Sequence, residues 1–224
     1  MPPKRPPLLN AAPDWKPDLS ESVILWHGCT MVAKNSIEAS GIDLTRCAVD
    51  TDFGRGFYTT TLKRQARLWA WDQFYQWQAA HPSGTGNQPV VLQFRVRRYT
   101  RTPWGSELDD GLDKLASLGF VRGDYDSEDY WSLVQHCRQS TPADPATGTP
   151  EVVHDHKRPT AGWYEMVCGP VAAFWRQRVT MTGADQFSFH TGGTDLLDAL
   201  VRAGKGKGRG GQGDSKYYRW SVVV

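Results

Sequence analysis

A histidine and a tyrosine about thirty positions apart both stand beside glycines, and their types and spacing could support chemistry. His27-Gly28 ends the apolar run SVILWHG, and Tyr58 lies in the segment TDFGRGFYTT of residues 51–60. A histidine at a strand end can hydrogen-bond a sugar hydroxyl, and a tyrosine ring can stack on a planar, positively charged ring. The pair therefore predicts a pocket for a nicotinamide nucleotide.

Such a pocket needs a framework of strands and helices. The apolar residues 22–26 predict a buried strand, and the two glycines of the GRG segment predict a tight loop that leads into a strand at FYTTT. Between residues 62 and 81 apolar side chains recur at helical spacing behind a predicted cap at Thr61, and residues 89–98 alternate as a half-buried strand does. Further elements are expected at residues 35–40 (helix), 106–118 (helix), 127–138 (helix), 164–167 (strand, broken by Gly169-Pro170), 187–190 (strand), 194–204 (helix capped by Thr194) and 217–224 (strand).

This order predicts an α+β domain with two small, mostly antiparallel sheets around a cleft that holds His27 and Tyr58. The 224 residues are enough for one core, and we expect the domain to span residues 21–224, behind an extended proline-rich arm at residues 1–20. Residues 204–214 are rich in glycine and lysine and are expected to form a flexible loop. A phosphate-binding P-loop and a Rossmann glycine pattern are both missing from the sequence.

The composition limits the classes of partner. A net charge of +2 is too small for whole-chain nucleic-acid binding, although residues 202–210 carry a basic run. Four scattered cysteines without a CxxC pair argue against a zinc site, and the lone His154-Asp155-His156 motif is weak, so no metal is expected. We expect no secretory signal peptide and no membrane span, hence action in a cytoplasm after delivery by other machinery, such as a secretion system.

The segments LWHG (25–28), DFGRGFYTT (52–60), YEMVCGPVA (164–172) and DQFSFHT (185–191) resemble a bacterial family of ADP-ribosyltransferase-like domains. That family belongs to the superfamily of His-Tyr-Glu transferases of the diphtheria-toxin and poly-ADP-ribose polymerase type. The resemblance implies a split pair of sheets around an NAD cleft. It also implies roles: His27 on a ribose hydroxyl, the Gly28 backbone on the nicotinamide amide, and Tyr58 stacked on the ring. Thr30, Phe57 and Thr59 are expected to line the same pocket.

The third catalytic group departs from the family pattern. The pattern implies a glutamate at the start of a late strand, where this chain has Gln186. Glutamine can hydrogen-bond a ribose hydroxyl but supplies no negative charge. Gln186 is the positional match, Glu165 on the YEMV strand is the leading substitute, and Asp185 and Asp52 are weaker candidates. If Gln186 fills the position, Gln186→Glu is expected to keep or raise NAD hydrolysis.

The resemblance thus predicts a mono-ADP-ribosyltransferase that uses NAD, as a toxin or effector domain. Its acceptor would be a protein or a nucleic acid, and an immunity protein or antitoxin would be a natural partner. An alternative is a module on the same fold that binds NAD or a partner with weak or no turnover. A third reading, NAD-dependent removal of an RNA 2′-phosphate, lacks a supporting Arg-His pattern in the sequence.

Overall fold

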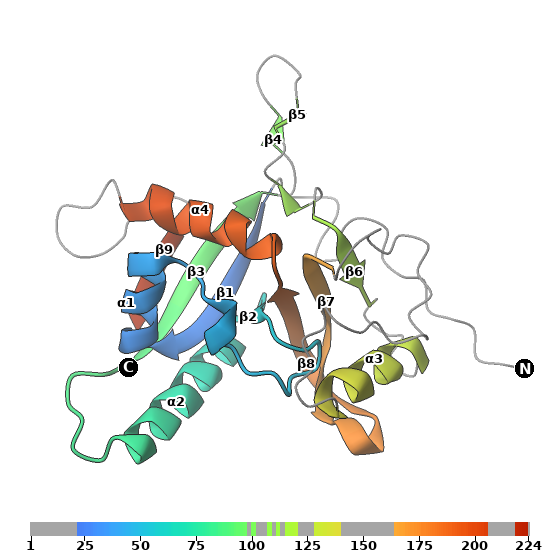
Figure 1. Cartoon of the computed structure of the whole chain (residues 1–224), viewed down its shortest axis with the longest axis horizontal. Coiled ribbons are helices and arrows are strands. Elements are labelled where there is room, and N and C mark those ends of the chain that lie inside the picture. Colours follow the sequence, from blue (N-terminus) through green and yellow to red (C-terminus); the bar gives the residue numbers. More distant parts are fainter. Residues whose placement is uncertain are drawn as a thin grey trace, which may run out of the picture.

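The computed structural model describes residues 22–97, 100–101, 107–108, 111–112, 115–120, 128–139, 164–205 and 218–223. Two mostly antiparallel sheets lie side by side, with helices packed against them (Figure 1). The fold is therefore mixed α+β, as the sequence predicts.

The first sheet has the order β1-β3-β9 and is antiparallel throughout, with β1 at Ser22–Thr30, β3 at Pro89–Arg97 and β9 at Tyr218–Val222. Alternation in β3 sends Val90, Leu92, Phe94 and Val96 into one core and Val91 to the opposite face. Helices α1 (Met31–Ser40) and α4 (Gly193–Lys205) cover the first face, and α2 (Lys63–Ala80) covers the second through Ala66 and Ala70.

The second sheet has the order β2-β8-β7-β6, with β2 at Phe57–Thr59, β8 at Val179–Phe189, β7 at Met166–Phe174 and β6 at Ser117–Gly119. Its pairs are antiparallel except for β6 and β7, which run parallel. Helix α3 (Glu128–Gln139) packs against one face of this sheet through Tyr130 and Val134. Two 3-10 turns (Leu44–Arg46 and Trp175–Gln177) and the short pair β4 (Thr100–Arg101) and β5 (Glu107–Leu108) complete the described elements.

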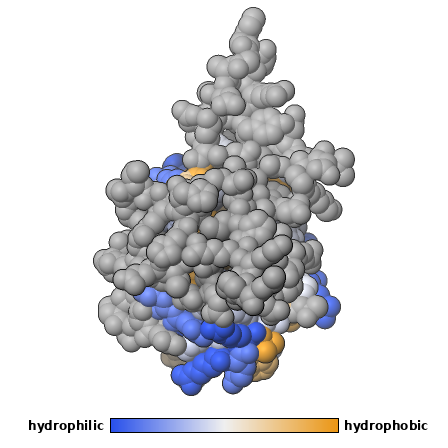
Figure 2. All heavy atoms as spheres, turned by 90° about the vertical axis from the view of Figure 1, so that its right-hand side faces the viewer, coloured by the Kyte–Doolittle hydropathy of each residue, from blue (hydrophilic) through white to orange (hydrophobic). Residues whose placement is uncertain are grey.

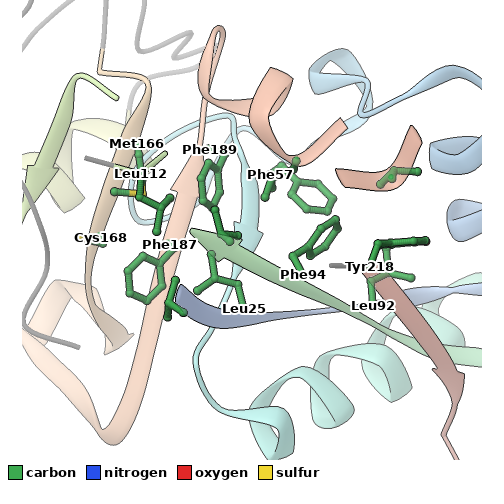
Figure 3. Packing of buried hydrophobic residues seen from close by; sticks show 14 of the residues in the cluster. Leu25, Phe57, Leu92, Phe94, Leu112, Met166, Cys168, Phe187, Phe189 and Tyr218 are labelled. Atoms are coloured by element: carbon green, nitrogen blue, oxygen red, sulfur yellow. The ribbon is translucent and has the colours of Figure 1, made fainter. Parts of the chain in front are cut away.

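The two sheets share one hydrophobic core. Phe57, Phe187 and Phe189 from the second sheet meet Leu25, Leu92 and Phe94 from the first, as Figure 3 shows. Phe57 packs edge-to-face on Phe94 with ring centroids 6.1 Å apart. This shared core fixes the end of β1 beside β2.

Most predicted elements are confirmed, and several are longer than expected. The strand predicted at residues 22–26 continues to Thr30, and the helix predicted at residues 35–40 begins at Met31, where the Thr30 hydroxyl accepts a hydrogen bond from Ala33 N. The strand predicted at residues 187–190 extends back to Val179. Helices α2 and α3 and strands β3 and β9 lie within a residue or two of their predicted ends.

The predicted helix at residues 106–118 is wrong. Within that range the described part of the chain contains strand residues at 107–108 and at 117–119. Leu118 is fully buried, and β6 is held by β7, whose Val167 lies opposite Leu118. A tertiary strand partner therefore overrides the local helical pattern.

The predicted break at Gly169-Pro170 is also wrong, because β7 runs through it to Phe174. Pro170 lies beyond the stretch that pairs with β6, so the missing N–H removes no bond to that strand. Gly169 allows close packing, since a Cβ there would lie 3.2 Å from both Phe53 and Phe120 and these side chains would have to shift by a few tenths of an ångström. The pairing with β8 shifts register just after Pro170.

Two predicted helix caps are wrong by one or two positions. Leu62 stands at the N-cap of α2 without a side-chain cap, because the Thr61 hydroxyl donates to Asp185 instead. Helix α4 begins at Gly193, one residue before Thr194. The predicted arm at residues 1–20 and the His154–His156 motif lie outside the described residues. The predicted 204–214 loop is described only at residues 204 and 205, which belong to α4.

The shared core predicts a sharp contrast between two phenylalanines of the second sheet. Phe189 is completely buried, whereas Phe174 is 64% exposed. Phe189→Ala should lower the free energy of unfolding by about 3–5 kcal/mol, because it removes a buried ring and leaves a cavity. Phe174→Ala should change it by less than about 0.5 kcal/mol. Urea unfolding followed by tryptophan fluorescence measures both, and equal midpoints for the two variants would contradict this placement of the core.

Candidate functional site

The middle of β1 and the residue after β2 are joined by an isolated bridge, at which the two sheets part. Trp26 N donates to Thr60 O at 2.7 Å, and Thr60 N donates to Trp26 O at 2.9 Å. One residue further along β1, the His27 side chain makes the next contact with β2, and its Nδ1 lies 2.6 Å from the Tyr58 carbonyl oxygen. The structure therefore brings His27 and Tyr58 into direct contact at the junction of the two sheets.

The backbone N–H and C=O of Gly28, a buried residue, both face this junction. In an antiparallel strand the N–H and C=O groups of residues two apart point to the same edge. Because both groups of Trp26 point away from β3, those of Gly28 do so as well. Among the described residues no backbone group on that edge pairs with Gly28. A Cβ at this position would lie 2.0 Å from the Ala66 carbonyl oxygen, so only glycine fits beneath α2.

The hydrogen bond to Tyr58 also sets the protonation of His27. A carbonyl oxygen only accepts, so Nδ1 must carry the hydrogen and Nε2 of the neutral ring is an acceptor. Burial lowers the pKa of His27 to about 4, partly opposed by the hydrogen bond to the Tyr58 backbone. The ring stacks on Phe57 with centroids 4.1 Å apart. His27 is thus a fixed, neutral imidazole that can accept a hydrogen bond from a hydroxyl group.

Tyr58 is held by the turn that precedes β2. Its hydroxyl accepts from Phe53 N and donates to Gly54 O, both at 2.9 Å, and the Thr51 hydroxyl lies 2.9 Å away. Burial raises the pKa of the phenol above its ordinary value, so the group stays protonated. Since Phe57 faces the shared core with His27, strand alternation puts the Tyr58 ring on the other face of β2, beside Phe53.

The other expected pocket residues have structural partners. Phe57 is buried under His27, and Thr59 is completely buried with its hydroxyl directed at Phe187 O. Thr30 caps α1. Phe57 and Thr59 therefore pack around the strand that carries Tyr58, and Thr30 has a capping role at the end of β1.

Gln186 is buried on the same face of the second sheet as Tyr58. Tyr58 pairs with Ser188 across β2 and β8, and Gln186 is the next residue of β8 on that face. The Gln186 amide nitrogen donates to Asp52 Oδ2 at 2.5 Å and to Pro170 O at 2.9 Å. The structure thus brings Gln186, Asp52 and Tyr58 to one face of the second sheet. Phe53, the residue after Asp52, donates its backbone N–H to the Tyr58 hydroxyl.

The two other acidic candidates are engaged elsewhere. Glu165 precedes β7; its Oε2 accepts from Ala116 N at 2.8 Å, and its Oε1 lies against Gly192 at the start of α4. Asp185 points to the other face of β8 from Gln186 and accepts from Thr60 and Thr61, while its backbone bonds the Gln65 amide. Neither carboxylate contacts His27, Tyr58 or Gln186 through a hydrogen bond within the described residues.

Sequence reasoning missed Arg138 and the central place of Asp52. Arg138 ends α3 and donates to Asp52 Oδ1 from Nε at 2.7 Å and from a terminal nitrogen at 2.5 Å. Asp52 is almost completely buried. The sequence does give a signal for Asp52, because an acidic residue stands directly beside a glycine turn. It gives no such signal for Arg138, which lies among polar residues near the end of a helix.

The outer surface near α3 has mixed character. In the space-filling view of this side, the coloured surface is mostly hydrophilic, with a small hydrophobic area at its lower edge (Figure 2). Large apolar side chains are exposed where β7 turns into β8, namely Phe174, Val179 and Met181. No helix in the described part of the chain is long and apolar enough to span a bilayer. In the same residues no three His, Cys, Asp or Glu side chains gather as a metal site would require.

Comparison of the chain with protein-family models, with curated proteins and with solved structures yields no significant match.

The neutral state of His27 predicts a pH dependence of stability. Its pKa is about 4 in the folded chain, below the ordinary value of 6.5. Between these values the unfolded chain binds the proton first, so stability falls as pH decreases from 6.5 towards 4. The melting midpoint of the wild type should therefore drop more between pH 7 and pH 4.5 than that of His27→Gln, which has no titrating group. Above pH 7 the two profiles should run parallel, and parallel profiles over the whole range would contradict a neutral, half-buried His27.

Proposed function

We propose that this chain is an NAD-dependent mono-ADP-ribosyltransferase built on an ADP-ribosyltransferase-like fold. The observation that carries the proposal is the backbone of Gly28, which has no hydrogen-bond partner on its free edge among the described residues, beside a neutral His27 where the two sheets part. An N–H and a C=O that face the same edge can bond the C=O and the NH₂ of a carboxamide, which is the recognition handle of nicotinamide.

The residues around Gly28 suit the rest of such a ligand. His27 Nε2 can accept a hydrogen bond from a ribose hydroxyl, since Nδ1 is committed to Tyr58 O. The Tyr58 ring is oriented by the three partners of its hydroxyl and offers a rigid aromatic face for a cationic ring. NAD would supply the ADP-ribose group through cleavage of its nicotinamide–ribose bond, and the chain's residues bind and orient the two halves.

Gln186 is the best candidate for the third group. It shares the face of Tyr58, and its amide oxygen is an acceptor for a ribose hydroxyl. The carboxylates of Glu165 and Asp185 are engaged with Ala116 and with Thr60 and Thr61, which argues against either as the catalytic acid. Glu165 stays the second choice on the sequence pattern alone.

A second candidate function is a binding module with weak or no turnover. The observation that favours it is the lack of a free carboxylate among the acidic candidates: Asp52 is paired with Arg138, and Glu165 and Asp185 are hydrogen-bonded. Without negative charge near the developing oxocarbenium, stabilisation of the transition state is reduced more than binding of the ground state.

The acceptor and the setting belong to the same proposal. A macromolecular acceptor, protein or nucleic acid, fits a toxin or effector that acts in a cytoplasm, and such a domain would have an immunity protein or antitoxin as a partner. These points rest on the sequence resemblance and on the basic residues 202–210.

Tyr58 gives the most direct test of the pocket. Tyr58→Ala should weaken NAD binding at least tenfold, about 1.4 kcal/mol, because the stacking face is lost. Tyr58→Phe should lose less, since the ring remains while only the hydroxyl anchor is removed. Tyr75→Ala, at a tyrosine that is 59% exposed on α2, is the matched control and should bind as the wild type does. Titration calorimetry with NAD measures all three, and unchanged affinity in Tyr58→Ala would refute the site.

Turnover separates the enzyme from the binding module. Purified protein should release nicotinamide from NAD and transfer label from NAD to protein or nucleic acid in a bacterial lysate, and His27→Ala should abolish both. NAD binding without release or transfer would favour the binding module. Neither binding nor release would reject both candidate functions.

A further inference from the structure

The Asp52 carboxylate is fully occupied by hydrogen bonds from three elements. Oδ1 accepts from Arg138 Nε at 2.7 Å and from a terminal Arg138 nitrogen at 2.5 Å. Oδ2 accepts from Ala172 N at 2.8 Å and from Gln186 Nε2 at 2.5 Å. With four donors around a side chain that is 2% exposed, Asp52 has no capacity left for a ligand.

These contacts fix which way the Gln186 amide faces. Its two amide hydrogens are directed at Asp52 Oδ2 and at Pro170 O, which both only accept. The flipped amide would set its own oxygen against two other oxygens, so a single orientation is chemically allowed. The side-chain oxygen Oε1 is then left as the acceptor, and no described residue donates to it.

We infer that Asp52 is a positioning residue that holds Gln186 with its oxygen as the acceptor for a ribose hydroxyl, so that the Asp52–Gln186 pair takes the place of a single glutamate. The inference rests on the proposed function and extends it to a residue that does not itself touch the ligand. Gln186 presents one acceptor oxygen, as one arm of a carboxylate would. The negative charge is on Asp52, which is hydrogen-bonded to the amide nitrogen of Gln186, and Arg138 partly offsets this charge.

The same geometry explains why position 186 holds a glutamine. A carboxylate there would face Asp52 Oδ2 at the 2.5 Å that the amide nitrogen now occupies, and also Pro170 O. Two carboxylates at such a distance cannot both be ionised without a large cost, and they bind one proton between them. The structure thus reverses the expectation from the sequence that Gln186→Glu keeps or raises activity.

The test exchanges the two groups and follows the pH profile of NAD hydrolysis. At pH 8, Gln186→Glu should reduce kcat/KM at least tenfold, mainly through kcat, because the acceptor is displaced from its position. At pH 5.5 a large part of the loss should be recovered relative to the wild type at the same pH, because the carboxylate pair then holds a proton. At pH 8, Asp52→Asn/Gln186→Glu should have a higher kcat/KM than Gln186→Glu, since two carboxylates no longer face each other. It should stay below the wild type, because Ala172 N–H then faces an amide NH₂ and Pro170 O faces a carboxylate.

Matched controls come from the exposed face of α2. Asp72→Asn and Gln73→Glu make the same chemical changes at exposed positions and should leave the pH profile unchanged. Gln186→Ala should lose activity to a similar extent at both pH values, because it has no group to protonate. Wild-type kcat/KM in Gln186→Glu at pH 8, or a double variant no better than Gln186→Glu, would overturn the positioning role of Asp52.

Stability measurements distinguish this failure from that of the proposed function. Gln186→Glu should melt at a progressively lower temperature than the wild type as pH rises from 5 to 8, because the folded chain holds the shared proton more tightly than the unfolded chain. The double variant should largely remove this trend. If the trend is found but the wild type neither binds nor hydrolyses NAD, the proposed function fails, and the positioning role with it. If NAD is hydrolysed and no trend is found, the pairing of Asp52 with Gln186 alone is rejected.

Discussion

The carboxylate of Asp52 accepts hydrogen bonds from the end of α3, from β7 and from β8 at once, and it belongs to the turn that carries β2. The removal of one partner from such a buried group leaves the others unpaired, which typically costs several kcal/mol. Arg138 compensates the charge, and the backbone N–H of Ala172 and the amide of Gln186 satisfy the remaining lone pairs. The placement of the Gln186 amide and of the turn before β2 relative to α3 and β7 therefore depends on this one ion.

Strand β2 is only three residues long, yet it divides the molecule into two packing regions. Phe57 enters the core shared by both sheets and supports the His27 ring, while Tyr58 faces Phe53 and the cluster under α3. The backbone carbonyl of Tyr58 accepts the hydrogen bond from His27 Nδ1. A slip of one residue in the pairing of β2 with β8 would exchange these faces and break both arrangements. The loop before β2 prevents such a slip, since Gly56 packs tightly against Ser188, where a Cβ would lie 2.0 Å from Oγ.

The parts of this fold that could be predicted from the sequence are those in which local pattern and tertiary packing agree. The alternation of residues 89–98 and the helical spacing of residues 62–81 reflect one buried face each, so β3 and α2 follow directly. The motifs also placed His27 and Tyr58 at one site; in the structure the His27 ring bonds the Tyr58 backbone carbonyl, while the Tyr58 ring lies on the other face of β2 beside Phe53. Residues 106–118 could not be assigned correctly, because Leu118 is a strand residue only by virtue of β7. Arg138 could not be predicted for a related reason. It matters as the partner of Asp52, and no local sequence pattern links the two residues.

The pairing of β2 with β8 determines when the junction can form during synthesis of the chain on the ribosome. Asp52 and Gln186 are 134 positions apart, and Tyr58 meets Ser188 across the same pair of strands. Strands β1 and β3 and helix α2 lie within residues 22–97 and can meet early in synthesis, whereas β2 has no strand partner until β8 emerges. Contacts between residues so far apart in the sequence form slowly and late in folding. A nascent or truncated chain that ends before β8 would therefore hold His27 and Tyr58 without the sheet that orients them, and the junction would be complete only after β8 has been synthesised.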